Sequence, residues 1–205
     1  MMHRLTRHPI RRHAAFSRQE IADLAKSMLA IGLAYTFLQM GLSFSSAFLV
    51  VFCISLLTIG AGFLLHELAH KFVARRFGCW AEFRSDDRML LVAVLFSFAG
   101  FLFVAPGAVI ILGQVTRRDY GLISAAGPLT NGILALGFIV LGILGAGMLP
   151  GSLSLIPTIG ARINSWLALF NMIPFGNFDG AKILRWNVPV YIGLVVFFGV
   201  LVFLV

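Results

Sequence analysis

Two histidines and a glutamate stand close together in residues 66–70, which read His-Glu-Leu-Ala-His. Residues four apart on an α-helix lie on one face, about a turn from each other, so His66 and His70 can bind one metal ion. Glu67 lies beside that face, where its carboxylate can take a proton from water at the metal. The spacing therefore predicts a zinc site with a general base next to it.

This motif lies in a segment that is apolar enough to cross a membrane. An apolar run over residues 47–63 leads directly into it, and Lys71, Arg75 and Arg76 close the segment. Ionisable side chains are costly in hydrocarbon, so three of them within five residues favour a function over packing. The alternative interpretation is a chance match at a helix end, with histidines that reach to the membrane surface.

The composition is that of a membrane protein. The chain has 205 residues, of which 60% are hydrophobic and only 12% charged, and its mean hydropathy is +0.96. Several apolar stretches approach or exceed the roughly 20 residues that cross a bilayer. The formal charge of +8 would indicate nucleic acid as a partner of a soluble protein, but the basic residues cluster at the ends of apolar segments. We therefore interpret the charge as a determinant of membrane orientation and predict no nucleic-acid partner.

The predicted fold is an all-α membrane protein, a polytopic helical bundle with five or six crossings and a small membrane-associated re-entrant or β element. Six full crossings would put Arg117, Arg118 and Lys182 on the outer side, against the positive-inside rule. Five crossings avoid this conflict if residues 89–113 enter the membrane and return to the same side, with a turn at residues 105–107 and strand-compatible residues beside it. We predict five crossings and keep the sixth as an alternative. The apolar runs cover residues 27–42, 47–73, 89–113, 122–149, 156–173 and 188–205.

Two regions are expected along the chain. Residues 1–26 form a basic cytosolic or interfacial segment without a cleavable signal peptide, and residues 27–205 form one transmembrane protease domain with its core at 47–185. A capping box at residues 17–20 predicts a helix that begins near Arg18. Cys53 and Cys79 are expected to be free thiols, because they should lie near opposite faces of the bilayer. Close helix packing is expected at three glycines of one apolar run, Gly127, Gly132 and Gly137.

A third metal ligand is predicted in the segment of residues 171–180. On the five-crossing topology this segment returns to the depth of the two histidines. A carboxylate that deep needs a partner, and two histidines with Asp179 leave the fourth tetrahedral position of a hydrolytic zinc site open. Two alternatives remain: Asp179 could cap a helix that starts at Gly180, or it could pair with Lys182 or Arg185.

The chain resembles the site-2 protease family of intramembrane zinc metalloproteases at three separate places. They are the motif at residues 66–70, the Gly-Pro-Leu-Thr-Asn segment at 127–131, and residues 171–180, in which Asn171, Pro174, Asp179 and Gly180 are in register. The resemblance covers about residues 47–185, in the order of the family. Residues 175–177 depart from it, because the family often has another proline there.

The resemblance implies a role for each matching residue. His66, His70 and Asp179 match the zinc ligands, and Glu67 matches the general base. Asn171 matches a residue that positions the substrate or stabilises the developing oxyanion. Residues 127–131 match a segment that packs close to the active site, and the membrane-associated strands of the family fall where we place the re-entrant element.

The function predicted from these observations is zinc-dependent hydrolysis of peptide bonds within or near transmembrane segments. The expected partners are a transmembrane protein substrate and the lipid bilayer, and the expected location is a prokaryotic plasma membrane with the N-terminus in the cytosol. Two alternatives are a metal transporter or ion carrier, and a scaffold that binds membrane helices without cleaving them. A carrier should show an internal repeat, and none is seen in the sequence.

Overall fold

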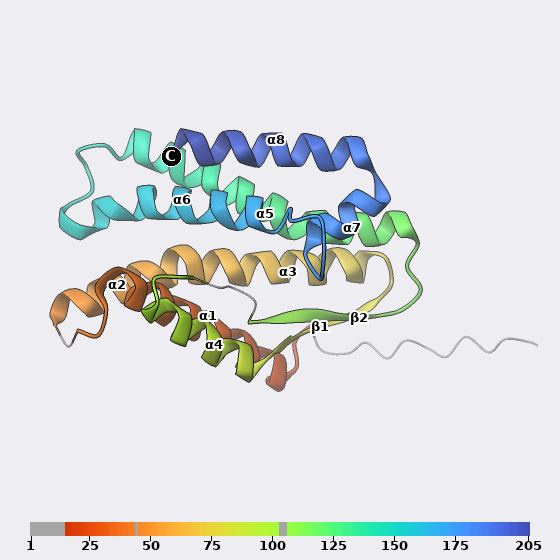
Figure 1. Ribbon diagram of the computed structural model, residues 1–205, viewed down its shortest axis with the longest axis horizontal. Helices are drawn as coiled ribbons and strands as arrows, with labels where there is room; N and C mark the ends of the chain where they lie inside the picture. Colours follow the sequence, from red (N-terminus) through yellow and green to blue (C-terminus); the bar gives the residue numbers. More distant parts are fainter. Residues whose placement is uncertain (1–14, 44, 103–105) are drawn as a thin grey trace, which may run out of the picture.

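Long helices lie side by side along the length of the protein, with a short hairpin of strands at one end (Figure 1). The structure is a computed structural model that describes residues 15–43, 45–102 and 106–205. Its elements are α1 (Arg18–Met40), α2 (Ser46–Ser55), a π-helical turn η1 (Leu56–Gly60), α3 (Ala61–Arg76), β1 (Trp80–Ser85), α4 (Asp87–Phe98), β2 (Gly107–Leu112), α5 (Arg117–Leu144), a 3₁₀ turn η2 (Gly151–Ser154), α6 (Leu155–Phe170), α7 (Asp179–Trp186) and α8 (Val188–Leu204).

Four helices are long and apolar enough to cross a membrane. They are α1, the continuous helix Ser46–Arg76 formed by α2, η1 and α3, α5, and the helix Gly151–Phe170 formed by η2 and α6. The last apolar helix, α8, is shorter, at 17 residues. These helices coincide with five of the predicted apolar runs, and the number of crossings, five or six, stays a prediction.

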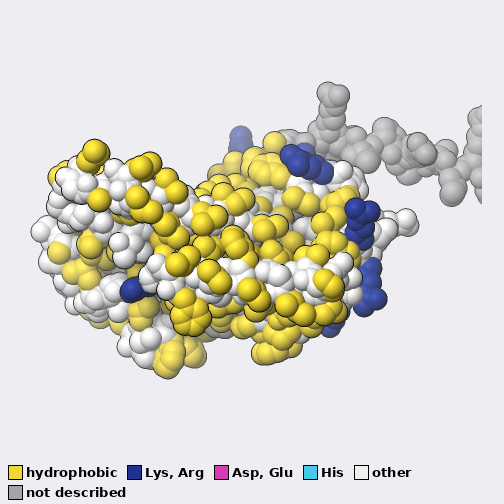
Figure 2. All heavy atoms as spheres, turned by 90° about the horizontal axis from the view of Figure 1, so that it is seen from above, with side chains coloured by type: hydrophobic (Ala, Val, Ile, Leu, Met, Phe, Trp, Pro, Cys, Tyr) yellow, Lys and Arg dark blue, Asp and Glu magenta, His cyan; other side chains and the backbone are white. Residues whose placement is uncertain are grey.

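Basic side chains gather at one end of the bundle. Figure 2 shows hydrophobic side chains along one long face, with most of the visible Lys and Arg side chains at one end. We call this the basic end. It is built from the start of α1, the end of α3, β1, the starts of α4 and α5, and α7. The basic residues of these parts are Arg18, Lys26, Lys71, Arg75, Arg76, Arg84, Arg88, Arg117, Arg118, Lys182 and Arg185. This clustering agrees with the topology that keeps Arg117 and Lys182 on one side.

The segment expected to be re-entrant starts and ends beside the same pair of strands, β1 and β2. Strand β1 pairs antiparallel with β2 from Trp80–Leu112 to Ser85–Gly107, and the Asp86 N–H donates to the Pro106 carbonyl at 2.8 Å. After β1 the chain forms α4 and then returns to β1 as β2. Of the two flanks that suit a strand as well as a helix, residues 108–112 lie in β2, residues 101–102 are not in a strand, and residues 103–105, with part of the predicted turn, lie outside the described residues.

Helix α5 is the centre of the packing, with α3, α6 and α7 against it. Small residues allow this close approach, since a Cβ on Gly132 would lie 2.8 Å from Phe198 and one on Gly160 would lie 2.6 Å from Phe138. Gly137 was wrongly predicted to serve the same purpose, because a Cβ there would meet nothing within 4 Å. The two cysteines are free, as predicted.

The start of α1 is held against the C-terminal half of α3, the helix that carries the histidines. Ser17 caps α1 by accepting from the Glu20 N–H at 3.0 Å, as the capping box predicts. The other half of the predicted capping box, a bond from the Ser17 N–H to the Glu20 carboxylate, is wrong. That carboxylate accepts instead from the Lys71 ammonium and from the Phe83 N–H. Lys71 and Glu20 are 2% and 0% exposed, and Lys71 also lies 3.9 Å from the Phe16 ring centroid. A buried ion pair therefore fixes α1 against α3.

Removing one partner of this pair is expected to destabilise the fold by about 3–5 kcal/mol, because the other charge stays buried and uncompensated. Glu20→Ala or Lys71→Met should each show this loss in thermal unfolding of the detergent-solubilised protein, and the double variant should lose less than the two single losses added. Asp87→Asn removes the exposed contact between Asp87 and Lys26 and should leave the unfolding midpoint unchanged. Equal midpoints for Glu20→Ala and the wild type would contradict this assignment.

Candidate metal centre

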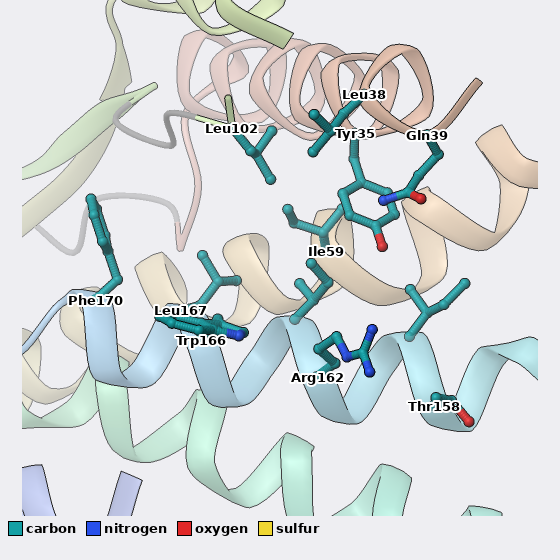
Figure 3. Close-up of a pocket in the computed structure, with 12 residues that line it drawn as sticks. Tyr35, Leu38, Gln39, Ile59, Leu102, Thr158, Arg162, Trp166, Leu167 and Phe170 are labelled. Atoms are coloured by element: carbon teal, nitrogen blue, oxygen red, sulfur yellow. The ribbon is translucent and has the colours of Figure 1, made fainter. Parts of the chain in front are cut away.

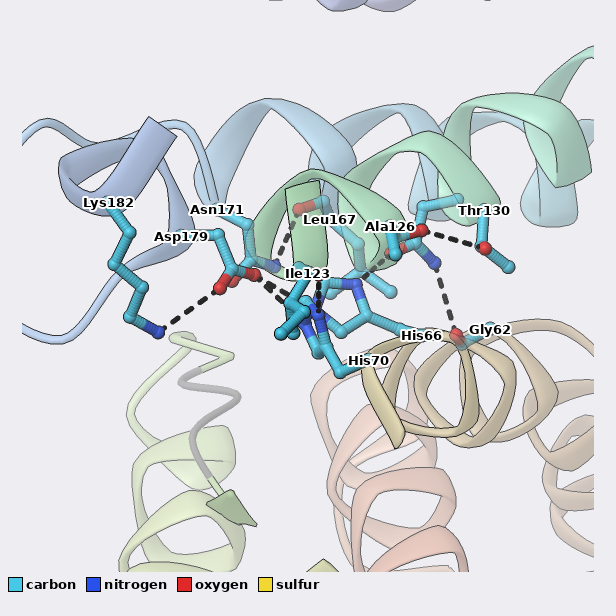
Figure 4. A network of polar contacts seen from close by, with 11 residues as sticks. Gly62, His66, His70, Ile123, Ala126, Thr130, Leu167, Asn171, Asp179 and Lys182 are labelled. Atoms are coloured by element: carbon cyan, nitrogen blue, oxygen red, sulfur yellow. Dashed lines mark hydrogen bonds and ion pairs between the residues drawn. The ribbon is translucent and has the colours of Figure 1, made fainter. Parts of the chain in front are cut away.

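Three potential metal ligands converge between α3 and the start of α7 (Figure 4). His66 and His70 stand one turn apart on α3, and their Nε2 atoms lie 3.0 Å from each other. Asp179 is the first residue of α7, and its Oδ2 lies 3.3 Å from His66 Nε2 and 3.1 Å from His70 Nε2. All three residues are buried, with one ligand atom from each within 4.8 Å of the others. The predicted ligand set is therefore brought together in space.

Each histidine is oriented by a hydrogen bond at its other ring nitrogen. His66 Nδ1 lies 2.6 Å from Asn131 Oδ1, and His70 Nδ1 lies 2.7 Å from the Ile123 carbonyl. Because both oxygens only accept, both Nδ1 atoms carry the proton, and a neutral ring then presents a lone pair at Nε2. Two such lone pairs and a carboxylate oxygen face one point, an arrangement that a cation stabilises and that matches the nitrogen and oxygen ligands of zinc.

The acceptor role of Asn131 is fixed by a chain of buried amides. Its Nδ2 donates to the Gly62 carbonyl at 3.1 Å and to Asn164 Oδ1 at 2.9 Å. Asn164 in turn donates to the Gly160 carbonyl at 2.9 Å. With its amide nitrogen committed to two acceptors, Asn131 can offer only its oxygen to His66. The network links α3, α5 and α6 behind the ligands.

Asn131→Ala is expected to weaken zinc binding by about 10–100-fold, the usual cost of losing a hydrogen-bond partner of a ligating histidine. Competition with a chelator of known zinc affinity measures this change. Thr130→Val is the matched control, because the Thr130 hydroxyl donates to the Ala126 carbonyl of its own helix and not to a ligand. Equal zinc affinity in Asn131→Ala and the wild type would contradict the role given to Asn131.

Helix α5 passes directly over the ligand atoms. A Cβ on Gly127 would lie 2.4 Å from His70 Nε2 and 2.5 Å from His66 Nε2. The predicted packing of residues 127–131 close to the site is thus seen at Gly127, which lies against both histidine rings. A glycine is required here because any side chain would collide with the Nε2 atoms of both histidines.

The ligands open into a cavity of about 690 Å³ that also contains the predicted catalytic residues. Glu67 is half-buried and lines this cavity next to the histidines. Asn171 also lines it, but its side-chain amide donates to the Leu167 carbonyl at 2.9 Å, and its own carbonyl accepts from the Gly180 N–H at 2.7 Å. In this structure Asn171 thus closes the end of α6 and fixes the start of α7. Residues of β2 form another part of the cavity wall.

Of the two alternatives considered for Asp179, the ion pair with Lys182 is present beside the histidines, whereas the helix cap is wrong, because α7 begins at Asp179 itself and not at Gly180. Its Oδ1 accepts from Lys182 Nζ at 3.2 Å while Oδ2 faces the histidines. The predicted break between helices is also seen, because α6 ends at Phe170 and α7 begins at Asp179. The ion pair therefore orients the carboxylate without withdrawing it from the site.

Two residues of functional interest on α6 were not predicted from the sequence. Asn164 is fully buried behind the site, and Arg162 is exposed on the side of the helix that faces α1. The available signal was a polar or charged residue inside the apolar run at residues 156–173, which in a membrane segment indicates a function.

A buried two-histidine, one-aspartate group inside a bundle of apolar helices defines this protein as a membrane protein with a metal centre. Relatives with curated names agree. The chain is 43% identical over 175 residues, covering 84% of this chain and 86% of the relative, to "Putative zinc metalloprotease MJ0611" of Methanocaldococcus jannaschii. It is 32% identical over 156 residues, covering 65% of this chain and 68% of the relative, to "Putative zinc metalloprotease YwhC" of Bacillus subtilis. No family model and no solved structure matches the chain. The chain belongs to the family of these zinc metalloproteases, and zinc is its metal cofactor.

Proposed function

We propose that this protein is an intramembrane member of the site-2 protease family, which hydrolyses peptide bonds within or near transmembrane segments of membrane-protein substrates. The observation that carries the proposal is the position of His66, His70 and Asp179, with Glu67 in the same cavity, on helices apolar enough to cross a bilayer. The protein is then a multi-pass protein of a prokaryotic plasma membrane, with its basic end and N-terminus on the cytosolic side.

The residues divide the reaction between them. Zinc, when bound by His66, His70 and Asp179, supplies Lewis-acid chemistry that lowers the pKa of water and polarises a peptide carbonyl. Glu67 accepts the proton of the attacking water and afterwards delivers it to the leaving amine. Asn171 lies in the cavity wall, where a turn of its amide away from the Leu167 carbonyl would let it donate to the developing oxyanion.

The substrate must be partly unwound before its peptide bonds can be attacked, because a helix holds its carbonyls in hydrogen bonds. Strand β2 lines the cavity from Gly107 to Ile111, and β1 pairs with it along one edge. We expect the unwound segment to pair with β2 as an added strand, which would hold it extended beside the metal ligands.

Ile110→Asp is expected to slow cleavage of a transmembrane substrate several-fold, because Ile110 is exposed on β2 in the cavity wall and an apolar segment would have to desolvate the new charge. Cleavage is measured on the reconstituted protein, with zinc content as a check that the site is intact. Leu91→Asp, at an exposed position on α4 outside the cavity wall, is the control. Unchanged cleavage by Ile110→Asp would exclude pairing along β2.

Two other functions would use the same ligands differently. A carrier needs coordinating residues along a path, but within the described residues His66, His70 and Asp179 form a single metal-binding group. A non-cleaving scaffold needs no general base, yet Glu67 stands in the cavity beside the ligands. Both observations favour hydrolysis.

The proposal is tested with the full-length protein in liposomes that also contain a synthetic single-span substrate. Mass spectrometry of the products should show cleavage inside or at the edge of the apolar segment, abolished by a zinc chelator and restored by zinc. Cleavage only in the polar parts of the substrate, away from its apolar segment, would overturn the proposal. Cleavage that the chelator leaves unchanged would also overturn it.

A further inference from the structure

Arg162 stands apart from every other described basic residue. It lies on α6, five residues or ~7.5 Å along the helix from Leu167, which lines the cavity of the metal centre, and on the side away from the basic end. Its side chain is exposed, and among residues 15–43, 45–102 and 106–205 no carboxylate lies within ion-pair distance of it. An exposed guanidinium on an apolar helix calls for an anionic partner.

A second cavity, of about 440 Å³, lies beside Arg162 between α1 and α6. Figure 3 shows the side chains of Tyr35 and Gln39 from α1 and of Arg162 from α6 pointing into the same space. These three polar groups are gathered near one another, and the rest of the wall is almost wholly apolar. The other residues of the wall are Leu38, Ile59, Leu102, Thr158, Ile159, Ile163, Trp166, Leu167 and Phe170.

The polar part of this cavity lies toward the end of α1 that is opposite the basic end. Helix α1 begins at the basic end and finishes at Met40, so Gln39 is its next-to-last residue. Long cationic side chains extend toward the headgroups while their stems stay in hydrocarbon. The backbone of Arg162 is near the middle of the helix Gly151–Phe170, but its side chain shares the space of Gln39, so its guanidinium can meet the phosphate of a lipid that enters the cavity from this end.

We propose that the cavity binds one membrane phospholipid, with its phosphate on Arg162 and one hydrocarbon chain along the apolar wall. The guanidinium matches a phosphate in charge and in hydrogen-bond geometry, and the Tyr35 hydroxyl and the Gln39 amide are further donors. Leu167 lines this cavity and the metal-containing one, so the lipid chain would end against the wall of the metal site. The inference requires only that the protein lies in a membrane and does not depend on proteolysis.

Trp166 offers a direct probe, since it lies in the wall of this cavity and is 54% exposed. The full-length protein in detergent is titrated with phosphatidylglycerol that carries bromine on its acyl chains, and quenching of tryptophan fluorescence is recorded. The wild type should show saturable quenching that Trp166→Phe removes. Brominated diacylglycerol, which lacks the phosphate, should give no saturable quenching, and inorganic phosphate should not compete.

The charge of Arg162 is tested by substitution. Arg162→Gln should raise the half-saturating lipid concentration about 10-fold or more, the usual effect of losing a hydrogen bond to a charged group, and Arg162→Lys should recover most of it. Arg88→Gln removes an exposed cation at the basic end and should change nothing. The proposal is overturned if Arg162→Gln binds the lipid as the wild type does. It is also overturned if the one effect of Arg162→Gln is a higher KM for substrates that carry an acidic residue. Arg162 would then bind a substrate carboxylate and not a lipid phosphate.

Discussion

Gly127→Ala is expected to abolish zinc binding. The added methyl would lie 2.4–2.6 Å from atoms of both histidine rings, against the Nε2 atoms that face Asp179. Helix α5 cannot move away easily, because it is held between α3, α6 and α7. We expect zinc affinity to fall by more than about 100-fold, beyond the range for losing a partner of a ligating histidine, and cleavage to fall with it.

Gly137→Ala is the matched control for this prediction. It introduces the same methyl in the same helix, where nothing lies within 4 Å, and it gives the same gain in helix propensity. Zinc per chain, measured after gel filtration in a metal-free buffer, should be normal in Gly137→Ala and near zero in Gly127→Ala. Normal zinc in Gly127→Ala would contradict the position of the metal centre.

Glu67→Gln is expected to retain zinc and to lose cleavage by roughly 10²–10⁴-fold, the contribution typical of a general base. Glutamine keeps the size and polarity of Glu67, and Glu67 does not belong to the group of converging ligand atoms. The variant should therefore fold and bind metal normally. Steady-state kinetics on the reconstituted protein, with zinc content determined on the same samples, measures both effects.

The two outcomes that would contradict this role are different. Loss of zinc in Glu67→Gln would make Glu67 a ligand, and wild-type cleavage would leave the reaction without an assigned base. Glu67→Asp serves as the conservative comparison, because it keeps the carboxylate on a shorter side chain and should retain part of the activity.

The parts of the site that sequence predicts well are local. His66, Glu67 and His70 follow from helix periodicity alone, and their grouping with Asp179 could be anticipated from the chain reversal at residues 171–180 and from family resemblance. The free cysteines and the start of α1 near Arg18 were also correct, since they depend on short-range signals.

The parts that sequence did not predict are long-range. Glu20 looks like one half of a capping box, but a buried ammonium on α3 competes for its carboxylate. The asparagine network behind His66 joins three helices, and no pattern within one helix indicates which amide meets which. Likewise Gly127 and Gly137 are equivalent in sequence, and only the position of neighbouring helices separates the essential glycine from the dispensable one.

The most direct test of the account is a zinc titration of the metal-stripped protein, with bound zinc and cleavage of a single-span substrate measured on each sample. Cleavage should rise in proportion to bound zinc and saturate at one zinc per chain, and Asp179→Asn should need far more zinc to reach the same point. Full cleavage by the stripped protein, or zinc binding in Asp179→Asn equal to that of the wild type, would contradict it.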